Sequence, residues 1–326
     1  MITIPKIELD ITTKSPIWTG NINKKMDGVK ESGISGSLRW WYEAILRGFG
    51  CKVCDPTSGE KCQFNAEEAE KDGLLERGFY KENKVCVCPA CQVFGCTGWS
   101  KQFRTQWYDD SENKFQLENP KPAYKHDKYD RQGHYIVSRD KNKENGKCKA
   151  IFYPKNKAIG NILSYLIKFS EKWGGFGARP QFGYGICEVE AIDNQYKPEI
   201  KMPKICASDS SSELPNLRDF FFCKFKPDFN PPKTMKTKDY DIDSENYYTI
   251  EIKYRIREAM RQFSKDIRHF ICGTTQDEKM SSKIFISRPI DNEIMIIRGY
   301  VPNNVPKKGD FTDYDRNEIL GIIHNI

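Results

Sequence analysis

The chain has 326 residues, of which 38% are apolar and 30% charged, and its net charge at pH 7 is +7. This length fits about two domains with cores of their own, and the apolar content excludes wholesale disorder. No apolar run of about 18 residues occurs, which excludes a membrane-spanning helix, and the first residues lack the apolar stretch of a signal peptide. We therefore expect a cytoplasmic protein with no membrane partner, whose mild basic excess permits a nucleic-acid partner.

The periodicity of residues 1–196 predicts a domain with the order strand, helix, strand, strand, helix, strand. Alternating apolar and polar residues indicate a strand at 2–11, and at Ile34 the period changes to that of a helix with Ser35 as its N-cap. The remaining elements are an amphipathic helix at 158–173 and strand candidates at 102–108, 133–138, 148–153 and 184–192. This order is that of the ferredoxin-like split βαβ arrangement.

Seven of the twelve cysteines lie in an insertion at about residues 50–98. Two Cys-x-x-Cys pairs in it can supply four thiolates to one tetrahedral ion, which would anchor a polar loop that has little core of its own. We therefore predict a structural zinc ion held by Cys51, Cys54, Cys88 and Cys91, with Cys62, Cys86 and Cys96 as alternative ligands. Buried thiols without metal, oxidised pairs and an iron–sulfur cluster are the other interpretations of this spacing.

Residues 197–246 are rich in proline, serine and charge, which predicts a linker with one strand at 220–225. Beyond it we expect a strand at 247–254, a helix at 255–271, a pair of strands at 283–287 and 293–300, and a last helix at 313–324. Residues 247–326 therefore form a smaller α+β domain, a degenerate copy of the first in this interpretation, although no sequence repeat supports that idea.

The most unusual segment is residues 174–185, which contain five glycines. It is neither a dinucleotide fingerprint nor a P-loop, because a strand follows it and no Gly-Lys-Ser/Thr does. Its glycines allow a close backbone approach, and with its arginine and aromatic residues it suits a phosphodiester backbone with unstacked bases. The RNA contacts predicted here are Gly175, Gly177, Arg179, Gln181 and Gly183; the alternative is a loop that needs glycine for packing.

Two helices supply the other candidate RNA contacts. Small residues at the start of the first helix would leave its N–H groups open to a phosphate, with an arginine beside them and an exposed tryptophan for base stacking; these residues are Ser35, Gly36, Ser37, Arg39 and Trp40. A basic stripe on the helix at 255–271 adds Arg257, Arg261 and Arg268, and weaker candidates are Arg104 and Arg288. Capped and solvated helices are the alternative interpretation.

Catalytic signals are weak in this sequence. None of its four histidines belongs to a recognisable metal or nucleophile motif, although His126 or His134 could serve a ribonuclease as a general base. We therefore expect a protein that is not an enzyme.

The segment Ser35-Gly36-Ser37-Leu38-Arg39-Trp40-Trp41 and the glycine-rich loop resemble the RAMP superfamily of CRISPR effector proteins. The double tryptophan, followed by residues 42–48, resembles the family of first subunits of type III-B Cmr complexes. Further matches are Ile17-Trp18-Thr19-Gly20, Val93-Phe94-Gly95 and Ile286-Ser287-Arg288-Pro289-Ile290. Two departures are the single arginine in the glycine loop, where family members tend to carry more basic residues, and the dense cysteine insertion.

This resemblance implies tandem ferredoxin-like, RRM-related domains and a non-catalytic subunit that holds guide RNA near its 3′ end, target RNA, or both, beside other subunits of the complex. Phosphate contacts would supply affinity, and guide–target pairing would read the sequence. The two alternatives are a metal-independent endoribonuclease of the same superfamily that processes guide RNA, and a structural zinc-bearing scaffold.

Overall fold

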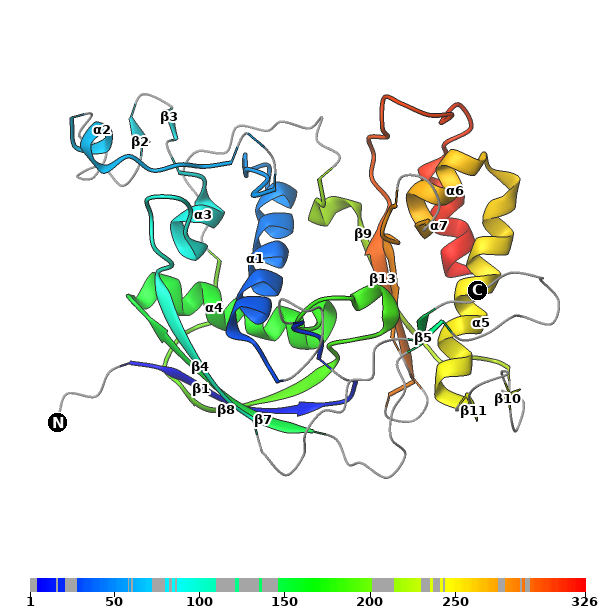
Figure 1. Ribbon diagram of the computed structural model, residues 1–326, viewed down its shortest axis with the longest axis horizontal. Helices are drawn as coiled ribbons and strands as arrows, with labels where there is room; N and C mark the ends of the chain where they lie inside the picture. Colours follow the sequence, from blue (N-terminus) through cyan, green and yellow to red (C-terminus); the bar gives the residue numbers. More distant parts are fainter. Residues whose placement is uncertain are drawn as a thin grey trace.

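The computed structural model describes residues 5–15, 17–20, 28–57, 59, 61–71, 80–81, 84–85, 87–109, 121–122, 135–136, 146–200, 214–229, 235–236, 241–242, 244–274, 279–287, 289–290 and 294–326. They form two units side by side, each with helices packed on one face of an antiparallel sheet (Figure 1). The predicted α+β class is thus confirmed. No helix among the described residues is both long and apolar enough to cross a bilayer.

The N-terminal unit is built on a four-stranded sheet with the strand order β4-β7-β1-β8. Its strands are β1 (Ile7–Thr13), β4 (Phe103–Asp109), β7 (Lys147–Pro154) and β8 (Cys187–Asn194), and every neighbouring pair is antiparallel. The helices α1 (Glu31–Gly48) and α4 (Lys157–Phe169) follow β1 and β7 in the chain and pack on the same face. The order of these six elements is the one that the periodicity predicts, whereas residues 135–136 of the expected strand at 133–138 pair outside this sheet.

Alternation along β1 explains which side of this sheet is covered. Ile7, Leu9 and Ile11 are buried against the helices, while Glu8 and Asp10 point to the other face. The side chain of Asn156 accepts a hydrogen bond from the Ile159 N–H and so begins α4. After Phe169, the chain continues as a π-helical turn, Ser170–Gly174, which leads into the glycine-rich loop.

Helix α1 begins five residues earlier than the sequence predicts, with Lys30 and not Ser35 at the N-cap position. The Thr19 hydroxyl accepts from the Lys30 N–H at 2.9 Å, and the Thr105 hydroxyl donates to the Glu31 carboxylate at 3.0 Å. Glu31 therefore supplies the negative charge that a helix N-terminus favours, and Ser35 is not the N-cap.

The cysteine insertion leaves α1 and returns at β4. It contains the short helices α2 (Ala66–Lys71) and α3 (Pro89–Phe94) and the hairpin β2 (Tyr80–Lys81) and β3 (Lys84–Val85). Two further short hairpins are β5 (Lys121–Pro122) with β6 (Tyr135–Ile136) and β10 (Met235–Lys236) with β11 (Asp241–Ile242).

The C-terminal unit has a three-stranded antiparallel sheet in the order β12-β13-β9. Its strands are β9 (Phe220–Phe225), β12 (Ile284–Ile286) and β13 (Met295–Tyr300), and its helices are α5 (Ser244–Ala259), α6 (Lys265–Cys272) and α7 (Arg316–His324). Because β9 pairs with β13 along its whole length, residues 220–225 belong to this sheet and not to a linker between domains.

Two predictions in this unit are wrong. Residues 247–254 alternate like a strand but lie inside α5, because Ile252, Ile256 and Met260 recur at helical spacing and fill the core against the sheet. The helix expected at 255–271 is broken near Phe263, since the Ser264 side chain accepts from the Ile267 N–H and starts α6.

Aromatic side chains fill the boundary between the two units. Trp40 of α1 contacts Phe220 of β9 with ring centroids 5.8 Å apart, and it also lies against Phe285 and Tyr300. Trp41 packs between Phe169 of the first unit and Phe220 of the second. The sheet of the C-terminal unit is therefore covered on both faces.

Candidate metal centre and nucleic-acid interface

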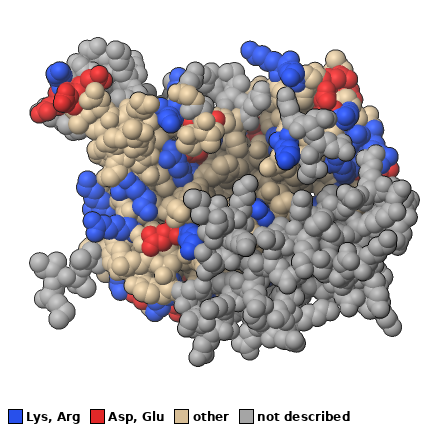
Figure 2. All heavy atoms as spheres, viewed as in Figure 1, with Lys and Arg blue, Asp and Glu red and all other residues tan. Residues whose placement is uncertain are grey.

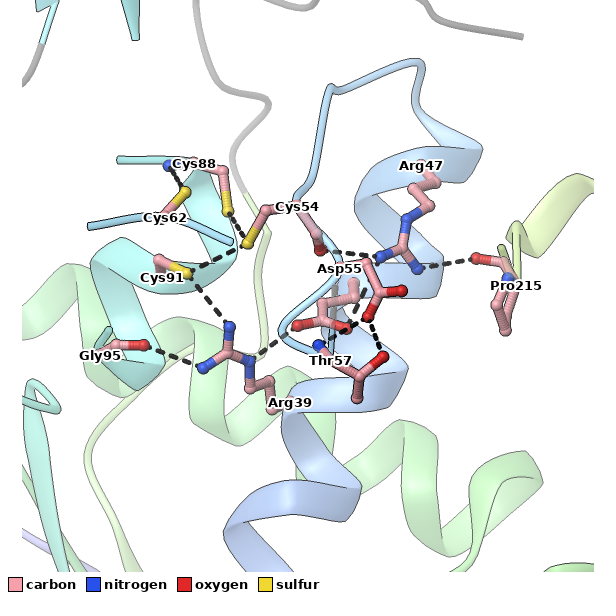
Figure 3. Close-up of polar contacts among 11 residues, drawn as sticks. Arg39, Arg47, Cys54, Asp55, Thr57, Cys62, Cys88, Cys91, Gly95 and Pro215 are labelled. Carbon is pink, nitrogen blue, oxygen red and sulfur yellow. Dashed lines mark hydrogen bonds and ion pairs between the residues drawn. The ribbon is translucent and has the colours of Figure 1, made fainter. Parts of the chain in front are cut away.

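Four cysteines of the insertion converge between α1 and α3 (Figure 3). The sulfur atoms of Cys54, Cys62, Cys88 and Cys91 all lie within 4.8 Å of one another. The Cys54 sulfur is 3.5 Å from that of Cys91 and 3.7 Å from that of Cys88. Ligands at the usual Zn–S bond length of a tetrahedral site stand about 3.8 Å apart, so these spacings fit a tetrahedral metal ion.

The donor set and its surroundings also fit a metal. The four sulfur atoms are so close that four thiolates would repel one another unless a cation lay among them. The Cys88 N–H donates to the Cys62 sulfur at 3.3 Å, an interaction that orients a metal-bound thiolate.

Three of the four predicted ligands are in this cluster, but Cys51 is not. Cys51 follows α1 directly, its N–H donates to the Leu46 carbonyl, and its side chain is buried in the core of the first unit. Cys62, one of the predicted alternatives, takes its place because the loop folds back onto Cys88. Cys96 lies outside the group of four, and Cys86 lies outside the described residues.

Arg39 belongs to this centre and does not face solvent as a phosphate contact. Its guanidinium group donates to the Cys91 sulfur at 3.1 Å and to the Gly95 carbonyl at 2.9 Å, and it pairs with Glu43 at 2.7 Å (Figure 3). Burial by itself lowers the pKa of Arg39, but these partners outweigh it and the pKa lies above the usual value. These three internal contacts engage Arg39 with the cysteine centre and Glu43, so the structure gives no support to its prediction as an RNA contact.

Glu43 and Arg47, on the same helix, also offset part of one another's buried charge. Glu43 is almost fully buried, and burial raises its pKa even though Arg39 and Arg47 oppose that shift. Arg47 donates to the Cys54 carbonyl and to the Pro215 carbonyl, both at 3.2 Å, and so ties the metal loop to the segment before β9.

Ser35, Gly36 and Ser37 also differ from the prediction. They lie in the second turn of α1, where the N–H groups are directed into the helix, so they do not form an open phosphate site. Trp40 is half-buried in the aromatic boundary, so it is no exposed stacking surface. Sequence alone showed the helix but not the second unit that packs against it.

The glycine-rich loop, residues 174–185, is held mainly by its own hydrogen bonds. Five of its N–H groups donate to carbonyl oxygens of the loop, of the preceding turn or of Trp18, and they belong to Gly175, Phe176, Ala178, Phe182 and Gly183. A side chain at residue 174 would meet Trp41, and one at residue 177 would come within 2.6 Å of the Trp18 carbonyl. Gly175 and Gly183 are buried as well. Both N–H groups are used within the protein, and glycine suits these two positions because their φ angles are positive, 75° and 84°. The structure therefore gives no support to a backbone cradle at Gly175 and Gly183.

Arg179 is the one charged residue of this loop, and it is half-buried. It is the one non-glycine residue with positive φ among the described residues, at 62°, which is a strained conformation for a side chain of its size. Its guanidinium group stacks on the Trp18 ring, 3.9 Å from the ring centre. Within the described part of the chain, no carboxylate or carbonyl partner occupies its hydrogen-bonding edges. Gln181 lies two residues on and is half-buried.

The basic stripe on the second unit does not form, because the helix that would carry it is broken. Arg257 donates to the Gly273 carbonyl at 3.0 Å, and Arg261 pairs with Glu258 at 2.7 Å. Arg268 lies on a separate helix, α6. Arg104 is exposed on the open face of the four-stranded sheet, and Arg288, His126 and His134 lie outside the described residues.

Two cations at the glycine loop were not among the predicted contacts, Lys253 of α5 and Arg298 of β13. The Lys253 ammonium group lies over the Phe182 ring, 5.1 Å from its centre. Arg298 is buried, with its Nη2 atom beside Gly175. An arginine directly after the apolar run Ile294-Met295-Ile296-Ile297 was the sequence signal for the second of these residues.

Comparison with known proteins gives one match to a family model, RAMP superfamily, over residues 10–188. No curated protein matches the chain. Among solved structures, Cmr1 from Pyrococcus furiosus is 12% identical, with 98% of this chain and 96% of that chain covered and a TM-score of 0.47.

A chain of the type III-B Cmr-beta complex bound to cognate target RNA is 12% identical, with coverages of 98% and 99% and a TM-score of 0.48. A chain of a type IV-B CRISPR complex is 14% identical over 61% of this chain and 95% of that chain, with a TM-score of 0.38. Since the family model matches more than half of its length, from β1 to the start of β8, this chain belongs to the RAMP superfamily.

Proposed function

We propose that the protein is a non-catalytic, RNA-binding subunit of a type III-B CRISPR effector complex. It would hold guide RNA near its 3′ end, target RNA, or both, beside the other subunits. Membership of the RAMP superfamily supports this proposal. So does the resemblance of α1, with its double tryptophan, to the first subunits of Cmr complexes. We infer further that both units are ferredoxin-like, the second without a fourth strand among the described residues.

The observation that most directly supports the proposal of RNA binding is the conformation and surroundings of Arg179. A strained backbone conformation persists only where the surroundings enforce it, and here Trp18 holds the guanidinium plane in place while its edges stay available. A planar fork of donors beside an aromatic ring suits a phosphate with a neighbouring base.

We also propose that the four-cysteine cluster binds zinc in a structural role. Four thiolates close the coordination shell and leave no position for a substrate, and Arg39 offsets part of their negative charge. In the full chain, metal analysis should give about one zinc per molecule, released by thiol modification. Iron in its place, or no metal under reducing conditions, would overturn the assignment.

The test of RNA binding uses the zinc-loaded full chain and labelled single-stranded RNA of mixed sequence. We expect intact RNA to be recovered, little sequence preference, and an affinity that falls steeply with salt. Arg179→Met should weaken binding about tenfold, whereas Arg261→Met, which removes an exposed arginine paired with Glu258, should not.

Three results would contradict the proposal. Cleavage of repeat RNA in the presence of a chelator would favour the endoribonuclease. No RNA binding at any salt concentration would favour the scaffold. Unchanged affinity in Arg179→Met would remove the observation on which this proposal depends.

A further inference from the structure

We propose that Lys253 and Arg298 of the C-terminal unit join Arg179 in one phosphate-binding path, which crosses the boundary between the units along the glycine loop. This inference rests on the proposed RNA binding and assigns half of the site to the second unit. The path would take the backbone of a single-stranded RNA, with nucleobases against the half-buried rings of Trp173 and Phe182.

Arg298 is the strongest evidence. It lies at the centre of β13, opposite Phe285 and Phe222, on the sheet face that is turned toward the N-terminal unit. Its side chain is 3% exposed, and its Nε atom has no hydrogen-bond partner. No described carboxylate pairs with it, and burial lowers its pKa to about 10.

A buried guanidinium group without a counter-ion is costly to the free protein, because desolvation is not offset by attraction. By contrast, the buried arginines of α1, Arg39 and Arg47, both interact with the Glu43 carboxylate. Arg298 departs from that pattern at the point where the glycine loop begins. An anion that reaches the loop from outside would supply the missing charge.

Lys253 stands at the other end of the loop. Its ammonium group contacts the Phe182 ring, and burial lowers its pKa to about 7. Among the described residues it has neither an ion pair nor a hydrogen bond. Arg179 lies three residues before Phe182, so that cations from α5, β13 and the loop itself all border the same segment.

The aromatic rings favour a nucleic acid over an acidic protein segment as the occupant. Four cations at or near the loop lie against a ring: Arg179 lies on Trp18, Lys253 lies over Phe182, and both Lys172 and Lys224 lie over the half-buried Trp173, at 5.2 and 5.5 Å. Alternating cations and aromatic faces are the pattern with which proteins bind single strands. Lys and Arg side chains also border the region between the two units in Figure 2.

The experiment measures RNA affinity against salt concentration and unfolding by denaturant for the zinc-loaded full chain and two variants, Arg298→Met and Lys253→Met. Each variant should bind about tenfold more weakly and reduce the slope of log affinity against log salt by about 0.7, the contribution of one phosphate contact in a single strand. Because a buried unpaired charge is removed, Arg298→Met should be at least as stable as the wild type when no RNA is present.

The matched control is Arg257→Met, which removes a cation one turn beyond Lys253 on α5. Arg257 holds the Gly273 carbonyl, so this variant should lose stability and keep the salt slope. Comparison of the wild type with these three variants distinguishes a charged side chain that binds RNA from one that stabilises the fold.

Two results overturn the inference while the wild type still binds RNA, which would leave the proposed function intact. One is an Arg298→Met variant that is less stable and has an unchanged salt slope, since Arg298 would then be a structural residue. The other is an unchanged slope with loss of assembly with the other subunits, which would assign Arg298 to a protein carboxylate. A wild type that binds no RNA would overturn both proposals together.

Discussion

The cysteine centre and the glycine loop both place arginines beside glycine and aromatic residues, yet they treat charge in opposite ways. Arg39 has a carboxylate, a sulfur and a carbonyl as partners, and its pKa is raised. Arg298 is more deeply buried, and its pKa is lowered to about 10 because burial is unopposed. Arg39 is thus held by internal partners that include a counter-charge, whereas Arg298 is buried without a described carboxylate to offset its burial.

The largest expected effect concerns the metal ligands. Cys62→Ser should lose the bound metal and, with it, the stability that binding supplies, about 4 kcal/mol when free metal stands 1,000-fold above its Kd. Cys51→Ser keeps all four sulfur atoms of the cluster and should retain one metal per chain. Metal analysis and denaturant unfolding test this pair. Loss of metal in Cys51→Ser but not in Cys62→Ser would restore the ligand set that spacing alone predicts.

Arg39→Met should be the next most severe change. It removes three internal contacts and leaves the buried Glu43 with Arg47 alone, which should cost about 3 kcal/mol of unfolding free energy. The salt slope of RNA binding should not change. A normal stability with a reduced slope would mean that Arg39 binds RNA and that the contrast between the two regions is false.

The pH dependence of the unfolding free energy tests whether the Lys253 amine is buried from water. Its pKa is about 7 in the folded chain and near 10.5 when exposed, so between these values the unfolded state binds more protons and stability rises with pH. Below pH 7 the amine is protonated in both states and adds no slope. From pH 7 to 9, the wild type should gain about 1–2 kcal/mol relative to Lys253→Met. Parallel stability profiles of the two proteins would show that Lys253 is not buried from water.

The smallest effect is expected at Gly36. An added Cβ there meets no atom within 4 Å, so Gly36→Ala should stabilise α1 by about 1 kcal/mol through helix propensity. RNA affinity should remain the same, because we place the RNA path at the other region. Weaker RNA binding in this variant would indicate close approach of a strand to α1.

The sequence predicted those elements whose pattern was both long and local. Helix α4 and strand β8 follow from periodicity, and three metal ligands follow from the Cys-x-x-Cys spacing. Residues 247–254 were predicted as a strand because β-branched and aromatic residues alternate along them. They form a helix because that conformation packs their apolar side chains against the sheet of the second unit. The partners of individual side chains could not be predicted from the sequence. Arg39, for example, binds atoms 52 and 56 residues away in the chain, and no local pattern reveals such contacts.

Photocrosslinking of thiouridine-labelled RNA to the zinc-loaded full chain, read by mass spectrometry, locates the bound strand most directly. We expect crosslinks in the peptides that contain Trp18, Trp173 and Phe182, at the boundary of the two units. Crosslinks confined to the cysteine insertion, or to Tyr108 and Tyr153 on the open face of the first sheet, would contradict it.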